Sequence, residues 1–142
     1  MAEPVFRHQY RVTYAECTIG NHVYYSRYLE ILEAARGEFF RHAGWPLLPL
    51  QESGAAFPVI GLQLTYKAQA RYDDLLTVEL WITELGGARL SFGFQILHSG
   101  GRLIAEGETR HVCASLDEKP RRMPKELAER FQPFVRLQND VA

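Results

Sequence analysis

The chain of 142 residues is long enough for one domain with its own hydrophobic core. Its net charge of −1 gives no general attraction for nucleic acid or for an anionic membrane surface. No apolar run approaches the roughly 20 residues that a membrane-spanning helix needs. We therefore expect one domain over residues 1–142, with its core at about 5–135, and neither a nucleic-acid nor a membrane partner.

The two cysteines, Cys17 and Cys113, are too few for a disulfide framework, and no cationic and then apolar leader precedes the first predicted strand. These features indicate a cytoplasmic protein with reduced thiols. Four histidines are too scattered for the ligand spacing of a metal site, so we predict no metal ion. They are His8, His42, His98 and His111.

The first third of the chain predicts a strand, a turn and a long helix. Apolar and polar residues alternate from Phe6 to Tyr14, which is typical of a half-buried strand. An irregular polar turn from Glu16 to His22 follows. From about Ser26, apolar residues recur at helical spacing until Gly44-Trp45-Pro46 ends the helix. They cover about half of its surface, so we expect a helix largely enclosed by other structure.

Arg36 lies inside the apolar arc of this helix, between Leu29 and Phe40. A guanidinium in that position should need a partner, and Glu33, three residues earlier, is the nearest carboxylate. The alternative is an arginine that reaches solvent at the edge of the helix.

The remainder of the chain predicts four strands joined by short turns. An irregular segment from Leu47 to Pro58 precedes them and is either a cover over a pocket or a plain connection. The strands and a final short helix are expected at about 62–70, 76–82, 90–96, 103–116 and 124–134. Because short turns force antiparallel neighbours, we predict an α+β domain whose sheet curls around the long helix.

Four segments resemble the hot-dog-fold acyl-CoA thioesterases of the 4-hydroxybenzoyl-CoA thioesterase type. In order, they are Val12–Arg36, Ala70–Asp74, Gly107–Cys113 and Lys119–Pro124. The resemblance implies a hot-dog domain, in which a five-stranded antiparallel sheet wraps around one long central helix. It also implies a homodimer, or a homotetramer built from dimers, with active sites at the dimer interface. The implied substrate is an acyl or aroyl thioester of coenzyme A, with no separate cofactor.

The resemblance assigns thioester hydrolysis to the turn before the helix. The backbone N–H of Tyr25, or of a close neighbour, would polarise the thioester carbonyl, in keeping with the unpaired N–H groups of a helix N-terminus. Similar enzymes carry an aspartate, as nucleophile or general base, at the position of Thr18. Threonine supplies no carboxylate, so the usual mechanism needs a substitute.

Three neighbours of Thr18 are candidate substitutes, each with a structural alternative. Glu16 can activate water, or it is a solvated or structural carboxylate. His22 can act as a base near neutral pH, or it is a structural hydrogen-bonding residue. Asn21 can orient a water or the carbonyl, or it shapes the turn. We favour Glu16 ahead of His22, and we give Cys17 a low rank because no His/Asn partnership is visible.

Three arginines are candidates for the phosphates of coenzyme A. Arg89 follows the Gly86-Gly87 turn, where similar enzymes carry basic residues, and Arg121 and Arg122 lie in the closing turn. Each is otherwise a surface charge. Two other functions remain open: a non-hydrolytic acyl-thioester-binding protein that lost its chemistry with Thr18, and a thioesterase that acts on acyl-carrier protein.

Overall fold

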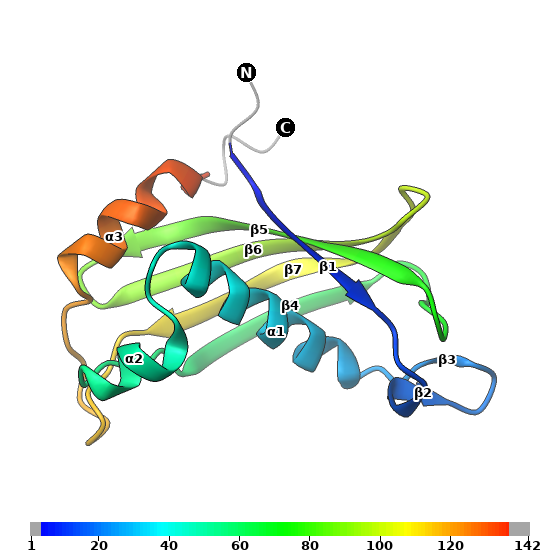
Figure 1. Ribbon diagram of the computed structural model, residues 1–142, viewed down its shortest axis with the longest axis horizontal. Coiled ribbons are helices and arrows are strands. Elements are labelled where there is room, and N and C mark those ends of the chain that lie inside the picture. Colours follow the sequence, from blue (N-terminus) through cyan, green and yellow to red (C-terminus); the bar gives the residue numbers. More distant parts are fainter. Residues whose placement is uncertain (1–3, 137–142) are drawn as a thin grey trace.

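The computed structural model describes residues 4–136, which form a curved five-stranded sheet with one long helix on its face (Figure 1). The sheet is antiparallel, with the strand order β1-β5-β6-β7-β4. Its strands are β1 (Phe6–Arg11), β4 (Val59–Tyr66), β5 (Leu75–Gly86), β6 (Arg89–His98) and β7 (Leu103–Val112). The helix α1 (Arg27–His42) begins and ends close to the positions that its apolar spacing predicts. The predicted α+β fold is confirmed.

The smaller elements lie at the two ends of α1. A turn of 3₁₀ helix, η1 (Tyr14–Glu16), and a short hairpin of β2 (Cys17–Thr18) and β3 (His22–Val23) precede it. The short helix α2 (Leu47–Glu52) follows it. The chain then closes with α3 (Lys125–Phe131) and η2 (Gln132–Phe134), which confirms the predicted C-terminal helix.

Three predicted strands run past their observed ends. The strand predicted at 62–70 ends at Tyr66, and the other two end early for identifiable local reasons. The first ends at Arg11 rather than Tyr14, because Thr13 begins the 3₁₀ turn that Glu16 closes. The last ends at Val112 rather than Leu116, because Ala114, after Val112, makes only isolated bridges. The predicted irregular segment also contains the helical turn of α2.

The core forms between one face of the sheet and the broad apolar side of α1. Phe39 is fully buried, and its ring stacks on Phe6 at 4.7 Å between ring centroids. Phe131 and Phe134 meet the same ring edge-on, so the C-terminal helices close this end of the core. Leu29, which the sequence places at one edge of the apolar arc, is not buried, because its side chain is 39% exposed.

The two edges of the sheet differ in chemistry. On β1, the outward residues Arg7, Gln9 and Arg11 are polar, which discourages pairing with another chain. On β4, large apolar side chains are exposed instead, with Ile60 at 64%. The others are Val59, Leu62 and Tyr66. An exposed apolar edge with unpaired backbone groups is suited to strand pairing.

Gly107, on β7, lies against the backbone of β4, so we expect Gly107→Ala to destabilise the protein. A β-carbon built at this position overlaps the carbonyl oxygen of Gln63. Backbone yields less readily than a side chain, and overpacking of this kind typically costs about 1–3 kcal/mol. Chemical denaturation measures the change, with Gly100→Ala as a control, since its β-carbon would lie 3.6 Å from the nearest heavy atom. Equal stability of the two variants would contradict this packing.

Candidate active site

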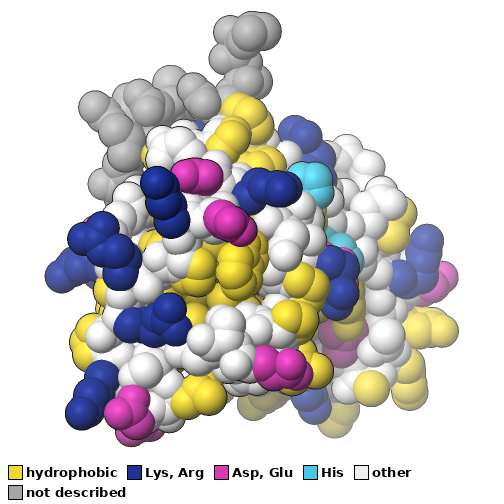
Figure 2. Space-filling model, turned by 60° about the vertical axis from the view of Figure 1, so that its left-hand side comes forward, with side chains coloured by type: hydrophobic (Ala, Val, Ile, Leu, Met, Phe, Trp, Pro, Cys, Tyr) yellow, Lys and Arg dark blue, Asp and Glu magenta, His cyan; other side chains and the backbone are white. Residues whose placement is uncertain are grey.

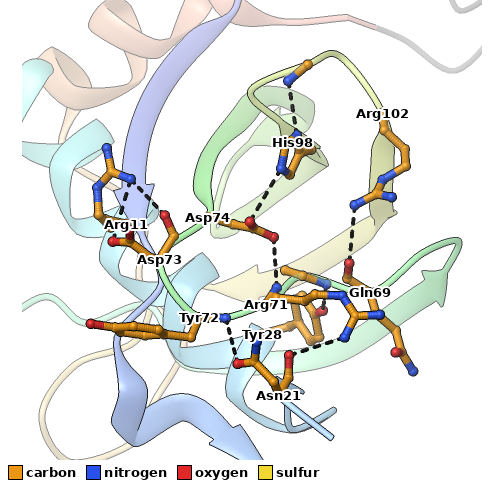
Figure 3. Close-up of polar contacts among 12 residues, drawn as sticks. Arg11, Asn21, Tyr28, Gln69, Arg71, Tyr72, Asp73, Asp74, His98 and Arg102 are labelled. Atoms are coloured by element: carbon orange, nitrogen blue, oxygen red, sulfur yellow. Dashed lines mark hydrogen bonds and ion pairs between the residues drawn. The ribbon is translucent and has the colours of Figure 1, made fainter.

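The polar turn before α1 is held in place by the turn between β4 and β5, as Figure 3 shows. The Arg71 guanidinium donates to the Gly20 carbonyl at 3.2 Å, and the Tyr72 backbone N–H donates to Asn21 Oδ1 at 3.3 Å. Asn21 has a positive φ of 59°, a conformation that asparagine tolerates better than most residues. Asn21 therefore shapes the turn through both its backbone and its side chain.

The supporting turn is itself fixed to three other elements (Figure 3). Arg11 of β1 donates to the Asp73 carbonyl at 2.7 Å. Asp74 accepts the Arg71 backbone N–H at 2.8 Å and lies 3.5 Å from Nε2 of His98. The Tyr28 hydroxyl, on α1, accepts the Ala70 N–H at 3.1 Å. Two segments that the sequence separates by about fifty residues thus form one rigid unit.

Glu16 is 8% exposed, and both of its carboxylate oxygens accept hydrogen bonds from the protein. Oε1 accepts from the Thr13 N–H at 2.7 Å and from its hydroxyl at 3.0 Å. Oε2 accepts from the Tyr10 hydroxyl at 2.5 Å. Burial, and then the hydrogen bond to Glu16, raise the pKa of Tyr10 to about 12, so this hydroxyl stays protonated and keeps donating. Glu16 thus ties the turn to β1.

Thr18 and His22 lie directly opposite each other in the β2–β3 hairpin. Cross-strand partners place their β-carbons about 4.5–5.5 Å apart on the same face of a hairpin. The His22 ring lies over Gly20, where a β-carbon would come within 2.9 Å of Nε2. No hydrogen bond within residues 4–136 involves a ring nitrogen of His22. The hairpin therefore pairs Thr18 with an imidazole that has no hydrogen-bond partner in the described residues.

Tyr25 lies just before α1. Its backbone carbonyl is hydrogen-bonded, whereas its backbone N–H is not. The carbonyl accepts the Tyr66 hydroxyl at 2.7 Å. The N–H donates no hydrogen bond within the described residues 4–136. It lies at the positive end of the helix dipole, where a developing oxyanion is stabilised.

Cys17, the low-ranked nucleophile, is held as a thiol. Burial is the main cause that raises its pKa, and the charges of Glu16 and Asp74 act in the same direction. Because the thiolate is the reactive form, these surroundings lower its nucleophilicity. Its Sγ lies 3.7 Å from the Thr13 carbonyl.

The three candidate phosphate-binding arginines come together at one end of the sheet. The closing turn pairs with the β5–β6 turn through two backbone bonds, from Cys113 N–H to the Ala88 carbonyl and from Met123 N–H to the Gly87 carbonyl. Arg89, Arg121 and Arg122 therefore lie on adjoining turns. Arg89 is exposed, 3.9 Å from Glu84, and Arg121 donates to the Ser53 carbonyl at 3.4 Å.

In a single chain, the arginines and the Tyr25 turn are at opposite ends of the molecule. Tyr66, the last residue of β4, contacts Tyr25. Val59, the first residue of β4, pairs with His111 of β7, and the next residue of β7, Val112, pairs with Arg89. Seven residue steps of a strand span about 23 Å at 3.3 Å per residue. The chain alone thus divides the predicted site into two halves.

A cavity of about 710 Å³ opens at the arginine end, between α1, α2 and the segment after β7. Its walls are mainly apolar and include Phe40, Leu47, Leu50, Phe57 and Leu116. Figure 2 brings this end forward and shows hydrophobic side chains gathered between Lys and Arg side chains. The predicted irregular segment covers a pocket, which was one of its two interpretations.

Two basic residues line this cavity in contrasting ways. His111 is 3% exposed, and its Nδ1 lies 3.0 Å from the Phe57 carbonyl and its Nε2 3.0 Å from the Thr109 hydroxyl. Since a carbonyl only accepts, Nδ1 carries the proton and Nε2 accepts from Thr109. Arg36 is half-buried and makes no hydrogen bond or ion pair within residues 4–136. The predicted ion pair of Arg36 with Glu33 is wrong, because their charged atoms are not within 4.0 Å of each other.

Within the described part of the chain, no three or more His, Cys, Asp or Glu side chains form a group that could hold a metal ion. The helices of residues 4–136 are also too short or too polar to span a membrane. His111, Phe57 and α2 were not among the predicted site residues. The only sequence signals for them were the Pro- and Gly-rich segment and the Gly107–Cys113 motif.

An enclosed helix, a wrapped five-stranded sheet and an unpaired N–H before the helix define a thioesterase-type hot-dog domain. Residues 12–131 match the family model described as the Thioesterase-like superfamily, and the chain belongs to this family. The resemblance that the motifs indicated is therefore confirmed.

Named relatives cover almost the whole chain. The acyl-CoA thioester hydrolase YbgC of Escherichia coli O6:H1 is 34% identical over 93% of this chain and 99% of its own. The acyl-CoA thioesterase YbgC of Haemophilus influenzae is 32% identical over 92% of this chain and 97% of its own. The hypothetical protein TT1821 of Thermus thermophilus superimposes with a TM-score of 0.83 at 34% identity, over 90% of this chain and 98% of that one.

Neutral burial of His111 predicts a loss of stability in acid. Burial, the main cause, lowers the pKa of His111 from 6.5 to about 4, and the charge of Arg36 acts in the same direction. Between these pH values the unfolded chain binds a proton that the folded chain does not, so stability falls as pH falls from about 6.5 to 4. Over this pH range the free energy of unfolding falls by about 3 kcal/mol because of His111.

Urea denaturation at a series of pH values measures this slope. His111→Gln should be less stable than the wild-type protein near pH 7. Its free energy of unfolding should no longer show the decrease from pH 6.5 to 4 that His111 causes. The control His42→Gln, at an exposed position, should retain it. An unchanged slope in His111→Gln would contradict the assignment.

Proposed function

We propose that this protein is an acyl-CoA thioesterase that hydrolyses an acyl or aroyl thioester of coenzyme A in the cytoplasm. The unpaired Tyr25 N–H at the start of α1 carries the proposal, because it offers a donor to the carbonyl oxygen. Membership of the thioesterase family and the names of the two YbgC relatives support the same reaction. No metal or separate cofactor takes part.

The reaction proceeds in two steps, addition of water to the carbonyl and loss of the thiolate. Water attacks the carbonyl carbon while a base takes its proton, and the Tyr25 N–H stabilises the oxyanion of the tetrahedral intermediate. The carbon–sulfur bond then breaks, and the leaving thiolate recovers a proton. The products are a carboxylic acid and the free thiol of coenzyme A. Thiol release from a panel of acyl-CoAs is the experiment that tests the function.

The same panel separates the two other candidate functions. A non-hydrolytic binder, which Thr18 favours, would show heat of binding in calorimetry with no thiol release. A carrier-protein thioesterase would hydrolyse acyl-carrier protein at a rate that free acyl-CoA does not reproduce. Either outcome replaces the proposal.

The hydrogen bonds of Glu16 favour a different ranking of the bases from that of the sequence. Thr13 and Tyr10 occupy three of the about four acceptor positions of the Glu16 carboxylate, and the residue is buried, so little of it is open to a catalytic water. His22 has no such bonds to break, and Thr18 lies opposite it in the hairpin. We therefore place His22 ahead of Glu16 as the general base, with the Thr18 hydroxyl holding the water and Asn21 shaping the turn.

A complete site requires two copies of the chain. Identical strands related by a twofold axis pair antiparallel, and β4 is the exposed apolar edge. Such pairing sets the Val59 end of one copy beside the Tyr66 end of the other. Arg89, Arg121, Arg122 and the cavity of one subunit then face the Tyr25 turn of its partner. We propose a homodimer of this kind, from which a homotetramer can be built.

If His22 is the base, His22→Ala should lower kcat about 10²-fold or more without loss of folding, since general-base catalysis contributes about 10²–10⁴-fold. Thr18→Asp in the His22→Ala background should restore part of the rate, because a carboxylate then stands where similar enzymes have theirs. Steady-state kinetics of thiol release measures both effects. Turnover that survives His22→Ala but is abolished in a folded Glu16→Gln variant would return the role to Glu16.

Ile60→Asp should convert the dimer to monomer and remove activity, because each carboxylate would be buried without a partner in the apolar seam between the paired β4 edges. Light scattering and thiol release measure the two effects on the same samples. Gln9→Asp is the matched control, since it adds the same charge to the opposite edge of the sheet. A monomeric Ile60→Asp variant with full activity would contradict the shared site.

A further inference from the structure

The apolar cavity contains one half-buried cation whose hydrogen-bonding capacity the protein does not use. Arg36 lies on the third turn of α1, about 14 Å from its first residue at 1.5 Å per residue. A guanidinium carries five N–H donors, and none of them has an acceptor within residues 4–136. Burial lowers the pKa of Arg36, although arginine remains charged at neutral pH. The charge of Glu33 acts on this pKa in the opposite direction from beyond ion-pair distance, and the guanidinium nitrogens still contact solvent, so a bound carboxylate would replace water as their acceptor.

The other polar groups of the cavity do not compete for this role. His111 is neutral, and both ring nitrogens are already engaged, by Phe57 and Thr109. Glu33 and Glu118 also line the cavity, but both side chains are exposed, so solvent screens their charge. Arg36 is therefore the group in the cavity that is positioned to recognise a charged ligand.

The chemistry of the walls limits what such a ligand can be. Phe40, Leu50 and Phe57 bury hydrocarbon, which fits an alkyl or aryl body. A planar guanidinium binds a carboxylate through two parallel hydrogen bonds, which is the strongest pairing open to it. A ligand with an apolar body and one terminal carboxylate satisfies both.

We infer that the cavity takes the acyl group of the substrate and that Arg36 binds a carboxylate at the far end of that group. Resting on the proposed function, this inference names the substrate class as thioesters of dicarboxylic acids. In the proposed dimer the thioester lies at Tyr25 of the partner subunit, at its backbone N–H, while the distal carboxylate is held by Arg36. Chains that end in a methyl group leave the guanidinium unpaired and are poorer substrates.

Matched substrate pairs test this specificity. Suberoyl-CoA and octanoyl-CoA have the same chain length and differ in the terminal carboxylate, as do adipoyl-CoA and hexanoyl-CoA. The wild-type protein should prefer the carboxylated member of each pair by about tenfold or more in kcat/KM, the size of one charge-assisted hydrogen bond. Arg36→Met should lose that preference. Arg36→Lys should retain part of it.

Arg41→Met is the matched control, since it removes an arginine from the exposed side of the same helix. It should leave the preference unchanged. Thermal unfolding and light scattering check that each variant folds and assembles. If Arg36→Met does not fold, the preference of the wild-type protein for the carboxylated substrates still tests the inference. A preference for octanoyl-CoA, or a carboxylate preference that survives a folded Arg36→Met, overturns the inference.

Binding measurements separate this inference from the proposed hydrolysis. Calorimetry with S-octyl-CoA and S-(7-carboxyheptyl)-CoA, which contain no cleavable thioester, reports recognition without chemistry. Tighter binding of the carboxylated analogue that Arg36→Met abolishes supports the inference even if no thioester is cleaved, in which case the proposed function fails. Hydrolysis of the panel with equal binding of both analogues overturns the inference and leaves the proposed function standing.

Discussion

The burial of α1 against the sheet is the constraint on which the rest of the structure depends. Its apolar side is too broad to rest on a flat surface, so the sheet must curve around it. That curvature places Tyr25 beside Tyr66 at one end of the helix and closes the other end with Phe131. The positions of the unpaired N–H and of the cavity follow from this single packing arrangement.

Polar contacts then fix what packing leaves undetermined. The turn before α1 buries little apolar surface, since Ile19 is 96% exposed, and the hydrogen bonds from Arg71 and Tyr72 hold it. Glu16 adds a second attachment, to β1. The carboxylate that the sequence marks as a base is therefore used for structure, and the hairpin leaves His22 next to Thr18. Function in this turn depends on which polar groups the fold leaves unpaired.

The cavity shows the same principle in its charges. His111 and Arg36 are both basic and partly or wholly buried, yet burial acts on them differently. Histidine gives up its proton and is satisfied by two protein partners, whereas arginine keeps its charge and has no partner in the described chain. The histidine is thus part of the wall, and the arginine is the group that can discriminate among ligands.

The sequence by itself determined the order of α1 and the five main strands, the approximate limits of α1, the antiparallel pairing and the family, because hydrophobic period and turn residues act locally. It also placed Thr18, Asn21 and Tyr25 in one turn. Only the tertiary structure decided that Glu16 is hydrogen-bonded, that Arg36 has no ion pair with Glu33, and that Arg89 lies across the molecule from Tyr25. The bonds from Thr13 to Glu16 form a local capping box, but the bond from Tyr10 depends on how the chain turns after β1. The distance from Arg89 to Tyr25 depends on pairing between segments far apart in the chain, such as β4 with β7, and no local pattern encodes it.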